Sequence, residues 1–196
     1  PFSSRHILNC DKMRKVKTLT IGVKILKECF VCDPKAGSLK WRQRPAHHFL
    51  SNRASSIFNT RFAGKLAGHI TKRGRSRVFI AYRGQRKPYL VHRVIWAMVT
   101  GEWPKKLIDH KDNKPFRNSF SNLRPATNAE NMMNSGVRSD SQSGVKGVRS
   151  RNGKFSAQIT IDGVSIHLGT FATLENAATA YSNAAYKHFG EFARLA

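Results

Sequence analysis

Four polar residues between positions 109 and 131 form the part of the sequence that most resembles an active site, namely Asp109, His110, Asn122 and Asn131. A neutral imidazole accepts a proton from water at working pH. Carboxylate and amide oxygens bind hard cations such as Mg2+ or Mn2+. Side chains of these types suit metal-assisted hydrolysis, in which a water attacks and a cation neutralises the growing charge. The competing interpretation is a plain surface turn, because D-H-x-D-N is rich in turn-forming residues.

Short strands and a capped helix are expected to position these residues. Apolar residues on either side of a polar loop predict two short strands. Thr127 followed by Glu130 is a capping box, which predicts that a helix begins there. The nine-residue step from Asn122 places Asn131 one turn into this helix, facing back toward the strand. The other polar residues of the loop are interpreted as turn formers: Asp112, Asn113 and Asn118.

Strand, loop and capped helix in this order resemble the phage-type HNH (ββα-metal) nucleases, through the segments IDH, SNLR and AENMMN. The resemblance implies that His110 is the general base. It implies that Asp109 and Asn131 hold one Mg2+ or Mn2+ ion through oxygen. It also implies that Asn122 braces the loop by hydrogen bonds to its backbone. Arg124, beside this brace, is a candidate phosphate contact.

An amphipathic helix precedes the motif. In VHRVIWAMVTG, apolar residues recur at helical spacing from Val91 to Val99, and Gly101 supplies a C-terminal stop. Arg93 and His92 are candidate phosphate contacts, and a structural role for His92 is equally open.

Residues 24–90 look like the leader found before the motif in phage HNH proteins, through CDPKAGSLKW and RFAGKLAG. We expect this leader to be irregular and mostly β, with strands near 39–41 and within RVFIAYRG and KPYLVHR. Its aromatic residues suit either a basic wall along DNA or internal packing, and packing is favoured. These aromatic residues are Trp41, Phe49, Phe58 and Phe62.

The C-terminal segment predicts a three-stranded antiparallel sheet and one helix. The pairs Asn152–Gly153 and Asp162–Gly163 mark two hairpin turns. Thr173 and Gly190 bound a helix whose small residues allow close packing on the sheet.

Residues 143–196 resemble the DNA-binding domain of plant ethylene-response factors, the apetala-two type, through GVKGVRSRNGKF, HLGTF and ENAATAYSNAAYKHFGEFA. In that family the sheet lies in the major groove, and cations on its strands reach bases and phosphates. The resemblance implies DNA contacts from four residues: Lys146, Arg149, Arg151 and Lys154. His167, Thr160 and Ser165 depart from the family pattern, so a different target sequence is expected. The alternative is an ordinary solvated strand face.

The charge balance points to a polyanionic partner. The chain has 35 Lys and Arg against 11 Asp and Glu, a formal net charge of +24. Residues 1–142 hold 29 of these basic residues against 8 acids, so the electrostatic attraction is concentrated there. No stretch reaches the ~20 apolar residues of a membrane span, and a soluble, intracellular protein is expected. Cys29 and Cys32 form an isolated C-x2-C and are interpreted as reduced packing residues.

Together these features predict an α+β chain of 196 residues. A basic arm (1–23) and a basic, mostly β leader (24–90) precede a ββα-metal HNH module (91–134). A linker (135–142) and a sheet-and-helix DNA-binding domain (143–196) follow. The predicted function is metal-dependent cleavage of double-stranded DNA, nicking or homing, by a monomer or weak dimer without a small-molecule cofactor. The resemblance implies a phage-encoded enzyme acting in the host bacterial cytoplasm. The alternatives are a non-catalytic DNA-binding regulator and an RNA-binding protein.

Overall fold

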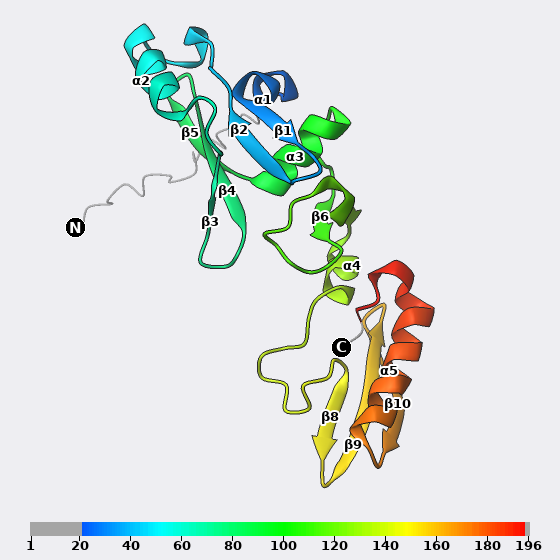
Figure 1. Ribbon diagram of the computed structural model, residues 1–196. Coiled ribbons are helices and arrows are strands. Elements are labelled where there is room, and N and C mark those ends of the chain that lie inside the picture. Colours follow the sequence, from blue (N-terminus) through cyan, green and yellow to red (C-terminus); the bar gives the residue numbers. More distant parts are fainter. Residues whose placement is uncertain (1–20, 195–196) are drawn as a thin grey trace, which may run out of the picture.

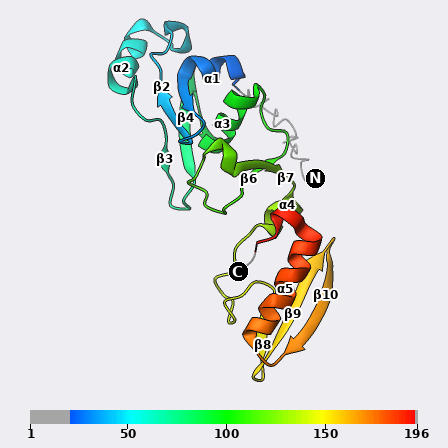
Figure 2. The same ribbon diagram turned by 45° about the vertical axis from the view of Figure 1, so that its right-hand side comes forward.

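The computed structural model describes residues 21–194, which form two lobes joined near α4 (Figures 1 and 2). The helices are α1 (Val23–Cys29), α2 (Asn52–Phe62), α3 (Val91–Thr100), α4 (Asn128–Met133) and α5 (Leu174–Phe189). The strands are β1 (Phe30–Asp33), β2 (Ser38–Trp41), β3 (His69–Ile70), β4 (Ser76–Tyr82), β5 (Gln85–Leu90), β6 (Leu107–His110), β7 (Leu123–Ala126), β8 (Val148–Arg151), β9 (Lys154–Ile161) and β10 (Val164–Phe171). These strands pair antiparallel in four small sheets, so the fold is α+β as predicted. Most of the predicted arm lies outside the described residues.

The first lobe packs α1 and α3 with the sheets β1–β2 and β3–β4–β5 around one apolar core. The predicted leader contains the strands β1 to β5, as expected, and also the helices α1 and α2, which the sequence pattern did not predict. The sequence of α2 has no clear amphipathic pattern, because its only fully buried residue is the polar Ser55 and the apolar Ile57 is exposed. Ser51 caps the N-terminus of α2, since its hydroxyl accepts a hydrogen bond from the Ala54 N–H.

The aromatic residues of the leader pack together. Phe58 contacts Trp41, Phe49 and Phe62, with ring centroids 4.9 to 5.4 Å apart. The buried guanidinium of Arg44 lies over three of these rings. The favoured interpretation, internal packing, is therefore confirmed.

Helix α3 follows the predicted pattern closely. Val91, Val94 and Ile95 are buried in the core of the first lobe. Gly101 ends the helix in the left-handed region at φ 83°, and its N–H donates to the Ala97 carbonyl oxygen. A residue with a β-carbon is strained in this conformation, which explains the glycine.

The ββα unit consists of β6 paired with β7, followed by α4. The predicted capping box is present: the Thr127 hydroxyl accepts from the Glu130 N–H, and the Glu130 carboxylate accepts from the Thr127 N–H. Both bonds satisfy donors that a helix N-terminus leaves free.

The second lobe is the sheet β8–β9–β10 covered on one face by α5. Both predicted hairpin turns are present, with positive φ at Asn152, Gly153, Asp162 and Gly163. A β-carbon at Gly147 would stand 2.1 Å from the Tyr181 ring, so α5 can approach the start of β8 only over a glycine. The other sheet face stays uncovered by α5.

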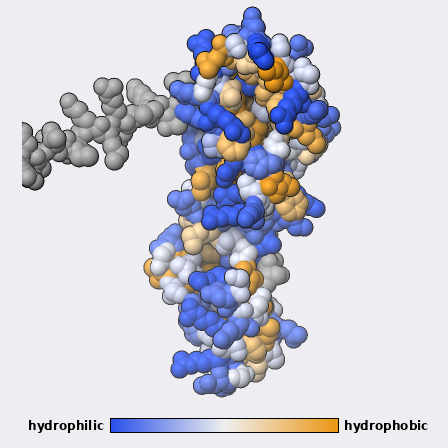
Figure 3. All heavy atoms as spheres, turned by 90° about the vertical axis from the view of Figure 1, so that its left-hand side faces the viewer, coloured by the Kyte–Doolittle hydropathy of each residue, from blue (hydrophilic) through white to orange (hydrophobic). Residues whose placement is uncertain are grey.

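Hydrophilic side chains dominate the face of both lobes seen in Figure 3, with smaller hydrophobic patches between them. No helix within residues 21–194 combines the length and apolar composition needed to cross a bilayer.

Candidate active site and nucleic-acid surface

Strand β6 carries Asp109 and His110 at its C-terminal end. Their partners on β7 are Arg124 and Leu123 respectively. Asp109 is 5% exposed and His110 is 7% exposed, so both functional groups lie within the protein interior rather than on a surface turn. The structure therefore excludes the plain-turn interpretation for these two residues.

The Asp109 carboxylate is held from two sides. The Arg124 Nε donates to its Oδ2 at 3.0 Å, and the Arg124 Nη2 lies 3.0 Å from the same oxygen. The Asn134 Nδ2 lies 2.9 Å from Oδ2 and 3.1 Å from Oδ1, and also donates to the His110 carbonyl oxygen at 2.8 Å. A buried carboxylate needs such donors because burial without them is costly.

The His110 imidazole is oriented by Asn118. The His110 Nε2 is 3.1 Å from the Asn118 Oδ1, and the Asn118 Nδ2 donates to the Phe116 carbonyl oxygen. Because the amide oxygen can only accept, Nε2 carries the hydrogen in this pair. The acceptor lone pair of the neutral ring is then on Nδ1, which is the atom available to take a proton. Asn118, interpreted from the sequence as a turn former, is thus buried and fixes the histidine.

His92 of α3 packs against the same imidazole, with ring centroids 4.9 Å apart and planes 79° apart. Burial, and then the nearby His110 and Arg93, lower the pKa of His92 to about 3. His92 is therefore a neutral side chain at physiological pH, and its Nδ1 has no hydrogen-bond partner among the described residues. This placement favours the structural role that the sequence left open over a phosphate contact.

Asn122 lies inside the loop that joins β6 to β7. Its Nδ2 donates to the Arg117 carbonyl oxygen and to the Asp112 carboxylate, both at 2.9 Å, and its Oδ1 accepts from the Asp112 N–H. Partial burial acts to raise the pKa of the Asp112 carboxyl, but hydrogen bonds from Asn122 and from the Lys114 N–H, together with the Arg117 cation, outweigh it and lower this pKa. The loop is therefore tied together through Asn122.

Two asparagines lie on helix α4 or just after it. Asn134, just after the helix, makes the contacts with Asp109 described above. Asn131, assigned to the metal from the sequence, is exposed, and its side chain has no hydrogen bond to another described residue. The two positions are three residues apart and lie on neighbouring parts of one helix face. Sequence spacing alone does not separate their roles.

Three of the six arginines and lysines that are candidate DNA contacts are engaged within the protein. Arg93 donates to the carbonyl oxygens of Pro104 and Lys106. Arg124 is buried against Asp109, and Lys146 Nζ lies within 3.3 Å of three carbonyl oxygens. The other three are exposed at one end of the second-lobe sheet: Arg149, Arg151 and Lys154.

The sheet face that α5 leaves uncovered carries polar and cationic side chains. Strand alternation turns Val148, Ala157 and Ile159 toward α5. Arg149 pairs with Ser156, and Arg151 with Lys154, on the opposite face. This face is polar and cationic, and it is open to a partner.

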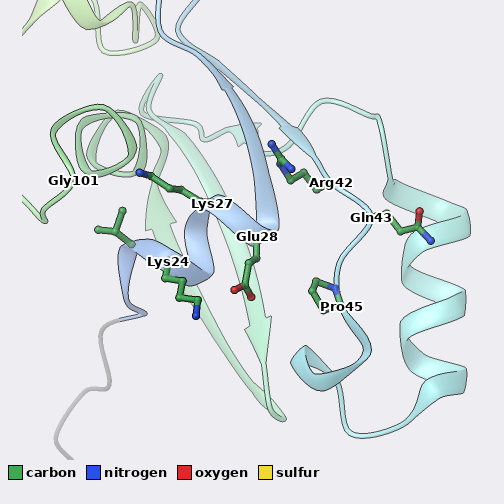
Figure 4. A pocket seen from close by; sticks show the side chains of 8 residues that line it. Lys24, Lys27, Glu28, Arg42, Gln43, Pro45 and Gly101 are labelled. Atoms are coloured by element: carbon green, nitrogen blue, oxygen red, sulfur yellow. The ribbon is translucent and has the colours of Figure 1, made fainter.

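A second group of titratable residues lies in the first lobe. The ligand atoms of Glu28, His47 and His48 lie within 4.8 Å of one another. Glu28 also lines a pocket of about 670 Å³ together with Lys24, Lys27 and Arg42 (Figure 4).

This second group is already paired. The Arg44 Nε donates to the His48 Nδ1, so the His48 Nε2 carries the hydrogen and donates to Glu28 at 2.7 Å. The hydrogen bond with His48 lowers the pKa of Glu28, and burial lowers the pKa of His48. Lys24, Lys27 and Arg42 lie around this cluster and repel a further cation.

Comparison with known proteins locates a nuclease family in the same part of the chain. Residues 89–133 match the family model of the HNH endonucleases. An uncharacterized HNH endonuclease of Acanthamoeba polyphaga mimivirus is 32% identical over 105 residues, 53% of this chain and 54% of the relative. The chain thus spans about half the length of that viral relative.

One solved structure is similar over most of the chain. It describes DNA binding and cleavage by the HNH homing endonuclease I-HmuI, at 23% identity and a TM-score of 0.39. The match covers 81% of this chain and 80% of that one. Residues 89–133 are thus similar to the HNH endonucleases, and the viral relative bears the same family name.

Proposed function

We propose that this chain is an HNH-type endonuclease that hydrolyses phosphodiester bonds of double-stranded DNA with one divalent metal ion. One observation carries the proposal: His110 and Asp109 are adjacent on β6, and Asn118 leaves the His110 Nδ1 free to accept a proton. A carboxylate and a general base side by side, within a segment that matches the HNH endonucleases, fit this chemistry.

The donor set fits a hard cation. The Asp109 Oδ1 accepts one hydrogen bond and so retains acceptor capacity, and the amide of Asn131 is uncommitted. Asp109 and Asn131 would hold Mg2+ or Mn2+ through oxygen, as hard cations prefer. When bound, such an ion supplies charge neutralisation at the scissile phosphate and the leaving oxygen. His110 takes the proton of the attacking water at Nδ1, and Asn122 keeps the loop in shape.

DNA binding is proposed along the basic surface of both lobes. The charge of +24 supplies attraction without sequence preference. The uncovered face of β8–β9–β10 would lie in the major groove, in the manner of the apetala-two domains it resembles, with Arg149, Arg151 and Lys154 as its cations. Tethering this domain to the nuclease raises the local concentration of substrate.

One active site per chain favours a nick, unless two chains meet on the duplex. Activity as a nicking or homing enzyme of a phage, in the host bacterial cytoplasm, is part of the proposal, and the viral origin of the relative agrees with a viral source.

Supercoiled plasmid incubated with Mg2+ tests the proposal. We expect conversion to nicked circles, no conversion in EDTA, and loss of conversion in Asp109→Asn with retained DNA binding. Binding without any cleavage in Mg2+ or Mn2+ would instead support the alternative, a DNA-binding regulator on a nuclease scaffold. Tighter binding to duplex RNA than to duplex DNA would support an RNA-binding protein.

A further inference from the structure

Arg124 of β7 contacts the second lobe at the turn that follows α5. Its Nη1 donates to the Glu191 carbonyl oxygen at 2.6 Å and lies 3.6 Å from the Glu191 carboxylate. Its guanidinium carbon is 3.7 Å from the centre of the Phe192 ring. Glu191 and Phe192 belong to the turn Gly190–Phe192 that follows α5, and Figure 2 shows this end of the chain beside α4.

The other side of the same guanidinium contacts the candidate metal ligand. Arg124 directs Nε and Nη2 at the Asp109 Oδ2. The Asp109 Oδ2 accepts two hydrogen bonds, one from the Arg124 Nε and one from the Asn134 Nδ2. The Asp109 Oδ1 accepts one, from the Asn134 Nδ2. The arrangement fixes the carboxylate by one oxygen and leaves the other with acceptor capacity.

We propose that Arg124 is a positioning residue for the metal-binding carboxylate and that the turn Gly190–Phe192 completes the nuclease site. The proposal rests on the proposed function, in which Asp109 binds the cation. The second lobe then has two roles. It contacts DNA through its open sheet face, and it holds the Arg124 guanidinium in the orientation that positions the Asp109 carboxylate.

The packing of Arg124 favours a positioning role over a contact with a DNA phosphate. Arg124 is 7% exposed, and its donors face Asp109 and Glu191 while Phe192 covers one face of the guanidinium. To reach a phosphate it would leave Asp109 as a buried charge without a cation, which is costly. Groups that orient metal ligands in this way change metal affinity by about 10–100-fold when they are removed.

A cation beside a metal site also has an opposite effect, because it repels the metal. If that effect dominated, Arg124 would be a competitor for Asp109, and its removal would tighten metal binding. The sign of the change in metal affinity therefore distinguishes the two roles.

Mn2+ binding to the full chain, measured by calorimetry without DNA, tests the proposal independently of cleavage. We expect Arg124→Gln to weaken Mn2+ binding about tenfold or more. Arg124→Lys should restore binding only in part, because an ammonium cannot span Asp109, Glu191 and the Phe192 ring together. Phe192→Leu, which keeps apolar bulk but loses the ring, should weaken binding by a smaller factor. It also provides a test if Arg124→Gln does not fold.

Arg138→Gln is the matched control, because Arg138 is exposed and pairs only with Asp140 among the described residues. It should bind Mn2+ like the parent, and duplex affinity in EDTA should be the same for all variants. Unchanged or tighter Mn2+ binding in folded Arg124→Gln and Phe192→Leu would overturn the inference. So would a loss of duplex affinity with unchanged Mn2+ binding. If Asp109→Asn binds Mn2+ like the parent, the metal site of the proposed function itself is wrong.

Discussion

The Nζ atom of Lys146 lies 2.6 Å from the carbonyl oxygen of Met133, the last residue of α4. The same ammonium lies 2.8 Å from the Ser135 carbonyl oxygen and 3.3 Å from that of Met132. A lysine of the second lobe thus caps the C-terminal end of the helix of the ββα unit, where carbonyl groups attract a cation. Burial, and then Arg194, lower the pKa of Lys146 to about 8.

Replacing Lys146 should loosen the contact between the lobes. Lys146→Met keeps the aliphatic stem and removes three hydrogen bonds, so we expect unfolding free energy to fall by about 1–3 kcal/mol. Lys154→Met, at an exposed strand position, is the control and should leave stability unchanged. Urea denaturation of both variants checks this prediction, and equal stability of the two would contradict it.

The two asparagines of α4 should separate into different roles. Asn134→Ala removes a buried amide whose Nδ2 donates to Asp109 and to the His110 carbonyl oxygen, and should lower stability by about 1–3 kcal/mol. Asn131→Ala should leave stability unchanged, since Asn131 is exposed, and should weaken Mn2+ binding. Calorimetry and thermal unfolding on both variants measure the two effects. An Mn2+ affinity equal to that of the parent in Asn131→Ala would show that Asn131 is not a metal ligand.

His92 should make the protein sensitive to acid. Its pKa is about 3 in the folded chain against an ordinary 6.5, so below pH 6.5 the unfolded chain takes up a proton that the folded chain does not. Stability is therefore lost as pH falls from 6.5 toward 3, with a slope of about 1.4 kcal/mol per pH unit from this group. His92→Phe keeps the ring packing and should flatten the profile between pH 6 and pH 4. Parallel profiles of parent and variant would show that His92 is not the group responsible.

The open sheet face should contribute to DNA binding through charge. Arg149→Gln and Arg151→Gln should each reduce the slope of log affinity against log salt by about 1, if each arginine neutralises one phosphate. Lys187→Gln is the control, because Lys187 is exposed on α5, which covers the other sheet face. Fluorescence anisotropy on a short duplex across a salt series gives these slopes. The same slope for all three variants would place DNA elsewhere on the protein.

Local signals in the sequence predicted several elements well. The capping box at Thr127 and Glu130, the hairpin turns near 152 and 162, and the glycine stop at Gly101 depend on residues within a few positions of each other. Helix α2 was not predicted because polar residues interrupt the partly buried face that carries Phe58 and Phe62, and the apolar Ile57 is exposed.

The sequence predicted only the part of the candidate site whose residues are close together along the chain. Asp109 and His110 are adjacent, and their strand was visible from the sequence. The side chains that orient them come from elsewhere in the chain, namely Asn118, Asn134 and Arg124. Arg124 is held in turn by the Glu191 carbonyl oxygen, 67 residues away. Only tertiary packing brings these groups together, so spacing alone could not assign them.

Single-turnover cleavage of a labelled duplex by His110→Ala tests whether His110 is the general base. We predict that the rate in Mg2+ falls by at least about 100-fold, because general-base assistance contributes a factor of this size, while duplex affinity in EDTA stays within twofold of the parent. His47→Ala, at an exposed histidine of the first lobe, should cleave at the parent rate. Cleavage by His110→Ala at the parent rate would contradict the assignment of His110 as the proton acceptor.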